Sequence, residues 1–182
     1  MFNWSIFILV FHLMAGAFQN ESSQEETSQY IETYKLLAID EMNRTGIPAS
    51  IILAQAIVES NSGTSELAIK ANNHFGIKCK NYWKGSTYYH KDDDHDRNGR
   101  LIESCFRKYD HTTASFIDHS NFLVNTLHYR SLFNNRRTDY KSWAHGLKQC
   151  GYATDRRYAE KLIKEIEKNQ LQEYDYYVIR YE

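Results

Sequence analysis

The 182-residue sequence has little proline, glycine and cysteine, and no excess of charge of either sign. A single proline and 8 glycines exclude collagen-like and low-complexity chains, which are rich in one or both. The 22 lysines and arginines nearly balance the 23 aspartates and glutamates, so the chain as a whole does not attract nucleic acid strongly. Hydrophobic residues make up 42% of the chain and charged residues 25%, as in globular domains. We therefore expect a folded globule that does not bind nucleic acid.

The three cysteines, Cys79, Cys105 and Cys150, match no zinc-site spacing. They allow at most one internal disulfide. Cys79 and Cys105 are the preferred pair, because both fall on strand-like segments that flank one hairpin. Three reduced thiols are the alternative.

The first 20 residues contain no Asp, Glu, Lys or Arg. The apolar stretch from Ile6 to Phe18 has the length of a signal-peptide core, and Ala15-Gly16-Ala17 supplies small residues for cleavage. A signal peptide over 1–19 predicts export to the periplasm or cell envelope, or secretion. An uncleaved signal anchor is the alternative, since no Lys or Arg precedes the apolar stretch. The polar residues 20–29 predict a solvated spacer.

The hydrophobic pattern predicts an α+β fold that is mostly helical. Between Phe75 and Tyr109 the pattern is strand-like, and Asn98-Gly99 is a strong hairpin signal, so a small antiparallel β-hairpin lobe interrupts the helices. The tyrosine-rich tail, 175–182, is either a last strand or an irregular end. The helices are expected over 30–44, 51–59, 65–71, 113–127, 139–149 and 156–168.

Glu59 is the most informative residue for chemistry. The segment Ile51–Glu59 is apolar on every side except at Gln55 and Glu59, which stand four apart and share one helix face. A buried carboxylate is costly unless it is paired, protonated or used. Burial and the negative end of the helix dipole both raise the pKa of Glu59, which suits a general acid. The alternative is a carboxylate that reaches solvent at the helix end.

A second group of carboxylates lies in the hairpin segment 90–99, HKDDDHDRNG. It has three interpretations. Like charges in a row usually form a solvated loop. The spacing from Asp94 to Gly99 also matches the start of a calcium loop, but Cys105 stands where the twelfth-position Glu belongs. Finally, one Asp can face Glu59, because glycoside hydrolysis commonly needs two carboxylates across the scissile bond.

Several motifs occur in the order found in bacterial glucosaminidase-type peptidoglycan hydrolases, glycoside hydrolase family 73, which includes the flagellar muramidase-like domain. The resemblance covers about 30–174 and defines the expected glucosaminidase domain. It implies a lysozyme-like fold and cleavage of the β-1,4 glycan backbone of peptidoglycan, on the reducing side of N-acetylglucosamine. The motifs are IILAQAIVESNSG at 51–63, NNHFGIK at 72–78, WKG at 83–85, CFRKY at 105–109 and GYATD at 151–155.

This resemblance implies that Glu59 is the general acid, in agreement with its chemistry, and that Tyr152 lies in the cleft and helps to hold the substrate or stabilise charge. An ordinary buried tyrosine is the alternative for Tyr152. We expect a monomer that acts on peptidoglycan glycan strands, needs no metal or cofactor, and contacts a membrane only through an uncleaved signal anchor.

The hairpin departs from the family pattern, because many members carry a Glu before the turn as their second carboxylate and this chain has none there. Counting from Trp83 places Asp94 at that position, with Asp92 and Asp93 ranked lower. A shorter Asp leaves room for a water and favours inversion of configuration, whereas assistance by a substrate N-acetyl group needs no carboxylate nucleophile. The sequence leaves both open.

The remaining predicted substrate contacts are aromatic rings, which stack on sugars, and amides, which bind glycan hydroxyl or amide groups. Core packing is the alternative for the rings, and helix or turn hydrogen bonds for the amides. The residues are Phe75, Trp83, Tyr88, Tyr89 and Trp143, with Gln55 and Asn73.

Other functions stay open at this point. A muramidase or lytic transglycosylase on the same scaffold would use Glu59 as both acid and base. A non-catalytic glycan-binding module would keep the groove without the chemistry, although it would not require a protonated carboxylate. A calcium-dependent binding protein would use the Asp94 loop.

Overall fold

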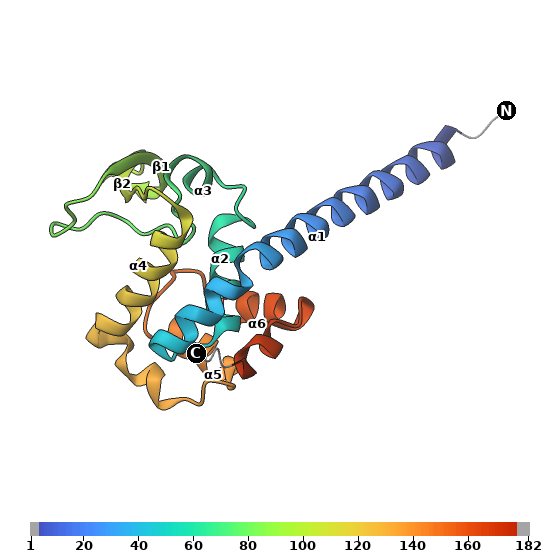
Figure 1. The fold of residues 1–182 in the computed structure, drawn as a ribbon. Helices are drawn as coiled ribbons and strands as arrows, with labels where there is room; N and C mark the ends of the chain where they lie inside the picture. The colour runs from blue at the N-terminus through green and yellow to red at the C-terminus, as the bar shows by residue number, and fades with distance from the viewer. Residues whose placement is uncertain (1–3, 178–182) are drawn as a thin grey trace.

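The computed structural model describes the backbone of residues 4–177 and the side chains of 21–92 and 94–177. Figure 1 shows the β-hairpin and α3 at one end of the molecule, α5 and α6 at the other, and α2 and α4 between them. The prediction of a mostly helical α+β chain with a hairpin lobe is confirmed. In chain order the elements are α1 (Trp4–Thr45), α2 (Ala49–Ser60), α3 (Glu66–Ala71), β1 (Thr87–His95), β2 (Leu101–Arg107), α4 (Thr112–Asn125), the 3-10 helix η1 (Leu127–Asn134), α5 (Tyr140–Gln149), α6 (Tyr158–Lys168) and the 3-10 helix η2 (Leu171–Tyr176).

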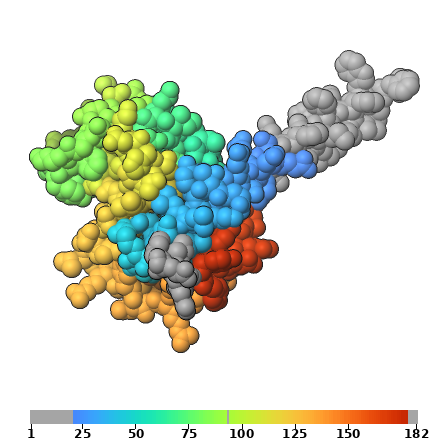
Figure 2. All heavy atoms as spheres, viewed as in Figure 1, coloured from blue at the N-terminus to red at the C-terminus, as the bar shows by residue number. Residues whose placement is uncertain are grey.

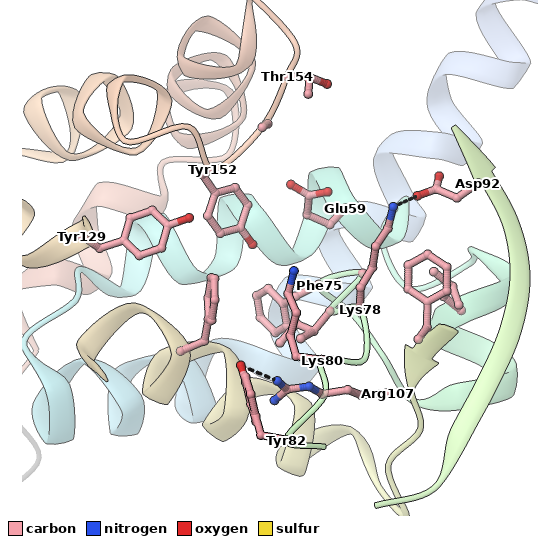
Figure 3. Close-up of a pocket in the computed structure, with 16 residues that line it drawn as sticks. Glu59, Phe75, Lys78, Lys80, Tyr82, Asp92, Arg107, Tyr129, Tyr152 and Thr154 are labelled. Atoms are coloured by element: carbon pink, nitrogen blue, oxygen red, sulfur yellow. Dashed lines mark hydrogen bonds and ion pairs between the residues drawn. The ribbon is translucent and has the colours of Figure 1, made fainter. Parts of the chain in front are cut away.

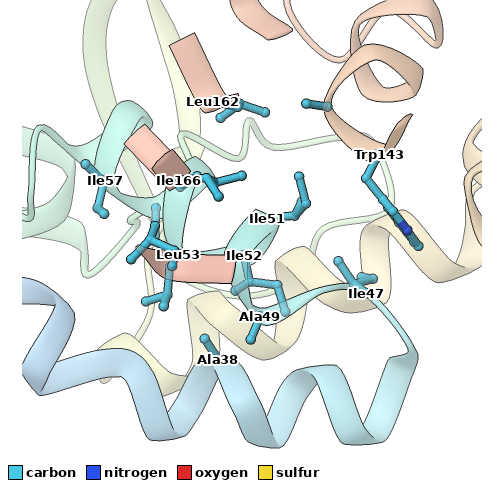
Figure 4. Packing of buried hydrophobic residues seen from close by; sticks show 14 of the residues in the cluster. Ala38, Ile47, Ala49, Ile51, Ile52, Leu53, Ile57, Trp143, Leu162 and Ile166 are labelled. Carbon is cyan, nitrogen blue, oxygen red and sulfur yellow. The ribbon is translucent and has the colours of Figure 1, made fainter. Parts of the chain in front are cut away.

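Helix α2 forms the centre of the core, as its all-round apolar sequence predicts. It packs against α1, α6 and η2. Its residues Ile51, Ile52 and Leu53 are fully buried, and Figure 4 shows them among side chains from α1 and α6. Burial of each such side chain stabilises the fold by about 1.5–3 kcal/mol. The helix ends where Asn61 takes a left-handed conformation, with φ of 50°, so that Glu59 lies in the last turn.

The hairpin pairs β1 with β2 in antiparallel register, with Tyr89 opposite Cys105 and Lys91 opposite Glu103. The register shifts between Lys91 and His95, which makes this part of β1 irregular. The predicted turn at Asn98-Gly99 is confirmed, and Gly99 has a φ of 75°, a conformation that glycine adopts without strain. Figure 2 shows the hairpin lobe in green beside α4 in yellow.

The strand-like segments 75–79 and 82–86 are not strands, apart from a single bridge between Lys78 and Phe106. The first of these segments bonds to β2 through the backbone of Ile77 and Cys79, and the side chain of Asn73 adds further hydrogen bonds. Its Nδ2 donates to the carbonyls of Ile77 and Arg107 at 3.0 and 2.9 Å, and its Oδ1 accepts from the Ile77 amide at 3.0 Å. This amide therefore holds a loop rather than a strand.

A disulfide joins Cys79 to Cys105, with 5.3 Å between their Cα atoms, which confirms the preferred pairing. The Cys79 amide also donates to the Cys105 carbonyl at 2.7 Å. Cys150 is a free, half-buried thiol. The disulfide attaches the loop after Phe75 to the second strand of the hairpin.

At the N-terminus, the segment expected to be a spacer, 20–29, continues helix α1. Most of its side chains are exposed, but Thr27 is buried and its hydroxyl lies 2.9 Å from that of Ser62. The side chains of the predicted signal segment, 1–19, lie outside the described residues. Within the part that is described, no helix combines the length and apolar character needed to cross a membrane.

The predicted tail begins inside η2, and residues 178–182 lie outside the described part. Its first residue, Asp175, is fully buried at the N-terminus of α2. There Oδ1 accepts from the Ser50 amide at 2.9 Å and Oδ2 from the Ser50 hydroxyl at 2.7 Å. Burial raises the pKa of Asp175 to about 6. Asp175 thus caps the N-terminus of α2. The sequence did not reveal this contact, because Asp175 and Ser50 are 125 positions apart.

We predict that Asp175→Ala lowers the free energy of unfolding by about 3 kcal/mol, because two buried donors on Ser50 lose their acceptor. The exposed Glu173 on the same short helix is the matched control, and Glu173→Ala should change stability by about 0.5 kcal/mol or less. Denaturant unfolding measures both. Equal losses in the two variants would contradict a capping role for Asp175.

Candidate active site

A cleft of about 460 Å³ lies against the C-terminal turn of α2. The described rest of its wall comes from α3, the loop from Phe75 to Tyr82, the two strands, α4, η1 and the loop 152–154. Figure 3 shows that Glu59, Tyr152 and Asp92 come to this cleft from three different elements. The structure thus brings together residues that the sequence separates by up to 93 positions.

Glu59 is half-buried in this cleft and is held by a chain of hydrogen bonds. The Tyr158 hydroxyl donates to Oε1 of Glu59 at 2.8 Å, and Nε2 of Gln55 donates to the Tyr158 hydroxyl at 3.1 Å. Gln55 is fully buried and is not among the residues described as lining the cleft, so its observed role is to support Tyr158. Gln55 and Glu59 do share a helix face, as predicted, and that face contacts α6.

Burial raises the pKa of Glu59, and this effect outweighs the others. The hydrogen bond from Tyr158 lowers the pKa, because it stabilises the charged carboxylate. The negative charge of Asp92 raises the pKa of Glu59, and the positive charge of Lys161 lowers it. The net effect favours a protonated Glu59 at a higher pH than an exposed glutamate, which is the property of a general acid.

Tyr152 lies in the cleft wall, where its ring stacks on that of Tyr158 with 5.5 Å between centroids. Burial and the charge of Glu59 raise the pKa of Tyr152 well above its usual value, so the phenol stays neutral and can donate a hydrogen bond. Behind it, His119 contacts the edge of the Tyr152 ring and stacks on Phe75 at 3.9 Å. Phe75 lines the cleft.

The hairpin carboxylates occupy different positions. Asp92 lines the cleft, with Oδ2 3.5 Å from the ammonium group of Lys78. Asp94 is not among the described cleft-lining residues; its Oδ2 accepts from Lys78 at 2.5 Å and from the hydroxyl of Ser104. These two donors lower the pKa of Asp94. The side chain of Asp93 lies outside the described residues. Of the hairpin aspartates whose side chains the structure describes, Asp92 is thus the one that lines the cleft.

The calcium-loop interpretation fits the hairpin poorly. The Oδ1 atom of Asp96 accepts from the amides of Asn98 and Arg100, at 2.8 and 2.9 Å, so this carboxylate closes the turn. Among the side chains that the structure describes, no three His, Cys, Asp or Glu residues gather in a way that could hold a metal ion.

Trp143 and Asn73 are corrections to the predicted substrate contacts. Trp143 is only 1% exposed and packs against Phe133 in the core, because helix α5 turns it inward. Asn73 is 1% exposed, and its side-chain amide is hydrogen-bonded to the backbone of Ile77 and Arg107. Trp143 therefore serves in core packing, and Asn73 in hydrogen bonding of the loop.

Three of the predicted aromatic contacts, Trp83, Tyr88 and Tyr89, are not among the cleft-lining residues described. Trp83 stacks under the guanidinium of Arg107 at 4.7 Å and donates its Nε1 proton to the Ser86 carbonyl. The Tyr88 hydroxyl donates to Glu66 at 2.6 Å, and Tyr89 is 63% exposed. Whether Trp83, Tyr88 or Tyr89 touches a longer glycan stays a prediction.

Three charged residues of the cleft wall, Lys78, Lys80 and Arg107, and the supporting Tyr158 were not predicted as site residues from the sequence. Tyr158 is recognisable only through tertiary contact, since it lies 99 positions from Glu59. Arg107 offered a weak signal, as a cation in a strand that proves buried; it is 4% exposed and donates to Asp118 at 2.7 Å. The two lysines flank Cys79, and their alternation along the loop was the available hint.

Comparisons with known proteins agree with this geometry. The family model described as mannosyl-glycoprotein endo-beta-N-acetylglucosaminidase matches residues 35–171. The chain is 42% identical over 132 residues to the exo-glucosaminidase LytG of Bacillus subtilis, covering 69% of this chain and 45% of that protein. It is 29% identical over 123 residues to the peptidoglycan hydrolase FlgJ of Vibrio cholerae, covering 65% and 36%. The chain thus spans less than half the length of these curated relatives.

Solved structures show the same fold. The catalytic domain of the autolysin Auto from Listeria monocytogenes superimposes with a TM-score of 0.73 at 28% identity, covering 82% of this chain and 87% of that one. The glycoside hydrolase domain of FlgJ from Salmonella typhimurium gives a TM-score of 0.63 at 25% identity, covering 81% and 90%. These likenesses confirm the predicted lysozyme-like class of fold.

We predict that Tyr158→Phe raises the pKa of Glu59, because the lost hydroxyl donated a hydrogen bond to the charged carboxylate. A carboxyl-carbon NMR titration measures this pKa. The matched control is Tyr140→Phe, which removes a hydroxyl that contacts Glu167 instead and should leave Glu59 unchanged. A lowered or unchanged pKa in Tyr158→Phe would show that the hydrogen bond does not govern Glu59.

Proposed function

Because the chain belongs to the glucosaminidase family, we propose that it is a glycoside hydrolase that cuts the β-1,4 glycan backbone of peptidoglycan next to N-acetylglucosamine. The observation that carries this proposal is Glu59, a half-buried carboxylate with a raised pKa that lines the cleft and is held by Tyr158. A pure binding site would not require such a group. The names of the relatives, an exo-glucosaminidase and a peptidoglycan hydrolase, support the same substrate.

In the proposed reaction, Glu59 gives its proton to the glycosidic oxygen as the bond from that oxygen to the anomeric carbon breaks. Positive charge develops on the sugar ring. A water molecule then adds to the anomeric carbon, and its released proton returns to a carboxylate of the cleft. Tyr158 fixes the position of Glu59, and the neutral phenol of Tyr152 donates to a sugar oxygen beside it.

We infer that Asp92, rather than the first-ranked Asp94, is the second carboxylate. It lines the cleft on the hairpin side, and its charge already acts on Glu59. From there it stabilises the positive sugar or activates the incoming water. Asp94 instead holds Lys78 in place through a short ion pair.

We propose that the protein acts as an exported monomer in the cell envelope. The uncharged apolar N-terminal segment supports export. The Cys79–Cys105 disulfide supports it independently, since disulfides persist mainly in oxidising compartments outside the cytoplasm.

Purified peptidoglycan digested with the wild-type protein should release fragments whose reduced ends, after borohydride treatment, are N-acetylglucosamine. Glu59→Gln should lower this rate by at least about 100-fold, because the amide cannot supply the proton. Glu103→Gln alters an exposed glutamate of β2 and is the control that should retain activity. Reduced N-acetylmuramic acid ends would indicate a muramidase, anhydro ends a transglycosylase, and glycan binding without cleavage a binding module.

The same assay distinguishes the roles of the two hairpin aspartates. We expect Asp92→Asn to lose most of the activity and Asp94→Asn to lose less, because only Asp92 reaches the cleft in the described residues. Circular dichroism and thermal unfolding of each variant check that the hairpin is intact. A larger loss from Asp94→Asn would return the role to the residue ranked first by sequence.

A further inference from the structure

The charged groups of the cleft are paired, with one exception. Glu59 is bonded to Tyr158, Lys78 lies beside Asp92, and Arg107 is bonded to Asp118. Lys80 also lines the cleft, and no hydrogen bond or ion pair connects its ammonium group to any of the described residues. One positive charge therefore remains available to a bound molecule.

The backbone of Lys80 is fixed on both sides, although its ammonium group has no partner in the described part of the chain. Cys79, the preceding residue, is linked to Cys105, and the Lys80 carbonyl accepts from the Trp83 amide at 2.8 Å. Figure 3 shows the side chain pointing from this loop into the cleft that Glu59 and Tyr152 line. A cation on a fixed loop, aimed at the reaction site, suits recognition of an anion there.

Peptidoglycan carries such an anion, whereas a polymer of N-acetylglucosamine carries none. Its muramic sugars bear a lactyl ether, which ends in a carboxylate on peptide-free strands and in an amide-linked peptide, with carboxylates of its own, on peptide-bearing strands. We infer that Lys80 binds a carboxylate attached to the muramic sugar and makes the cleft prefer these strands to neutral N-acetylglucosamine polymers. This inference rests on the proposed function and names a determinant of specificity within it.

The test measures binding, so that it does not depend on turnover. Glu59→Gln serves as the background, and its affinity is measured by calorimetry for three ligands: a peptide-free muramyl tetrasaccharide, the same tetrasaccharide with stem peptides, and N-acetylglucosamine tetramer. Adding Lys80→Gln should weaken binding of the carboxylated ligand by about tenfold and leave the neutral tetramer unchanged. Lys80→Arg should restore most of the affinity.

Two controls make the result specific. Lys84→Gln removes an exposed lysine of the same lobe outside the described cleft lining and should change nothing. The difference between ligands should also shrink as salt is added, since it depends on charge. An effect on peptide-free strands alone identifies the lactyl carboxylate, and an effect on peptide-bearing strands alone identifies a carboxylate of the peptide; either supports the inference.

Equal weakening for all three ligands, or none, would overturn the inference while leaving the proposed function intact. Wild-type protein that cleaves no peptidoglycan would overturn the proposed function instead, and the inference with it. The digestion described above therefore distinguishes the two failures.

Discussion

The hydrogen bonds that run from Gln55 through Tyr158 to Glu59 are the interaction on which the site depends. They join the buried helix α2 to α6 and provide a donor for a carboxylate that burial would otherwise leave without one. Burial raises the pKa of Glu59 and the tyrosine moderates the rise, so the same contacts set both the protonation and the position of the acid. Stacking of Tyr152 on Tyr158 extends this control to the next residue of the cleft wall.

The opposite wall is held by a different kind of support. The loop that carries Lys78 and Lys80 has almost no strand pairing, and it is positioned by the amide of Asn73, the Cys79–Cys105 disulfide and the guanidinium of Arg107. Asn73 and the disulfide fix the backbone, while Arg107 stacks on Trp83 within the loop and bonds to Asp118 of α4. Lys78 and Lys80 thus stand on a loop that is attached to its surroundings at several points, which is a condition for the proposed specificity.

Sequence reasoning predicted the features that local pattern determines. The all-round apolar run identified α2 and Glu59, Asn-Gly identified the hairpin turn, and the flanking cysteines identified the disulfide. It ranked Asp94 above Asp92, because residue counting assumes a regular strand, whereas the register of β1 shifts between Lys91 and His95. Other roles depend on partners far along the chain. Residue type alone does not show that Trp143, Gln55 and Asn73 are buried. Nor does it show that Tyr158 contacts Glu59 or that Lys80 lines the cleft.

The most direct test of this account is a crystal structure of Glu59→Gln bound to a muramyl tetrasaccharide. We expect the glycan to lie along the cleft with a glycosidic oxygen within hydrogen-bond distance of the side-chain amide of residue 59. We also expect Asp92 to face the same sugar from the hairpin side. A glycan bound elsewhere, or one whose scissile oxygen lies away from residue 59, would contradict the assignment of Glu59 as the acid.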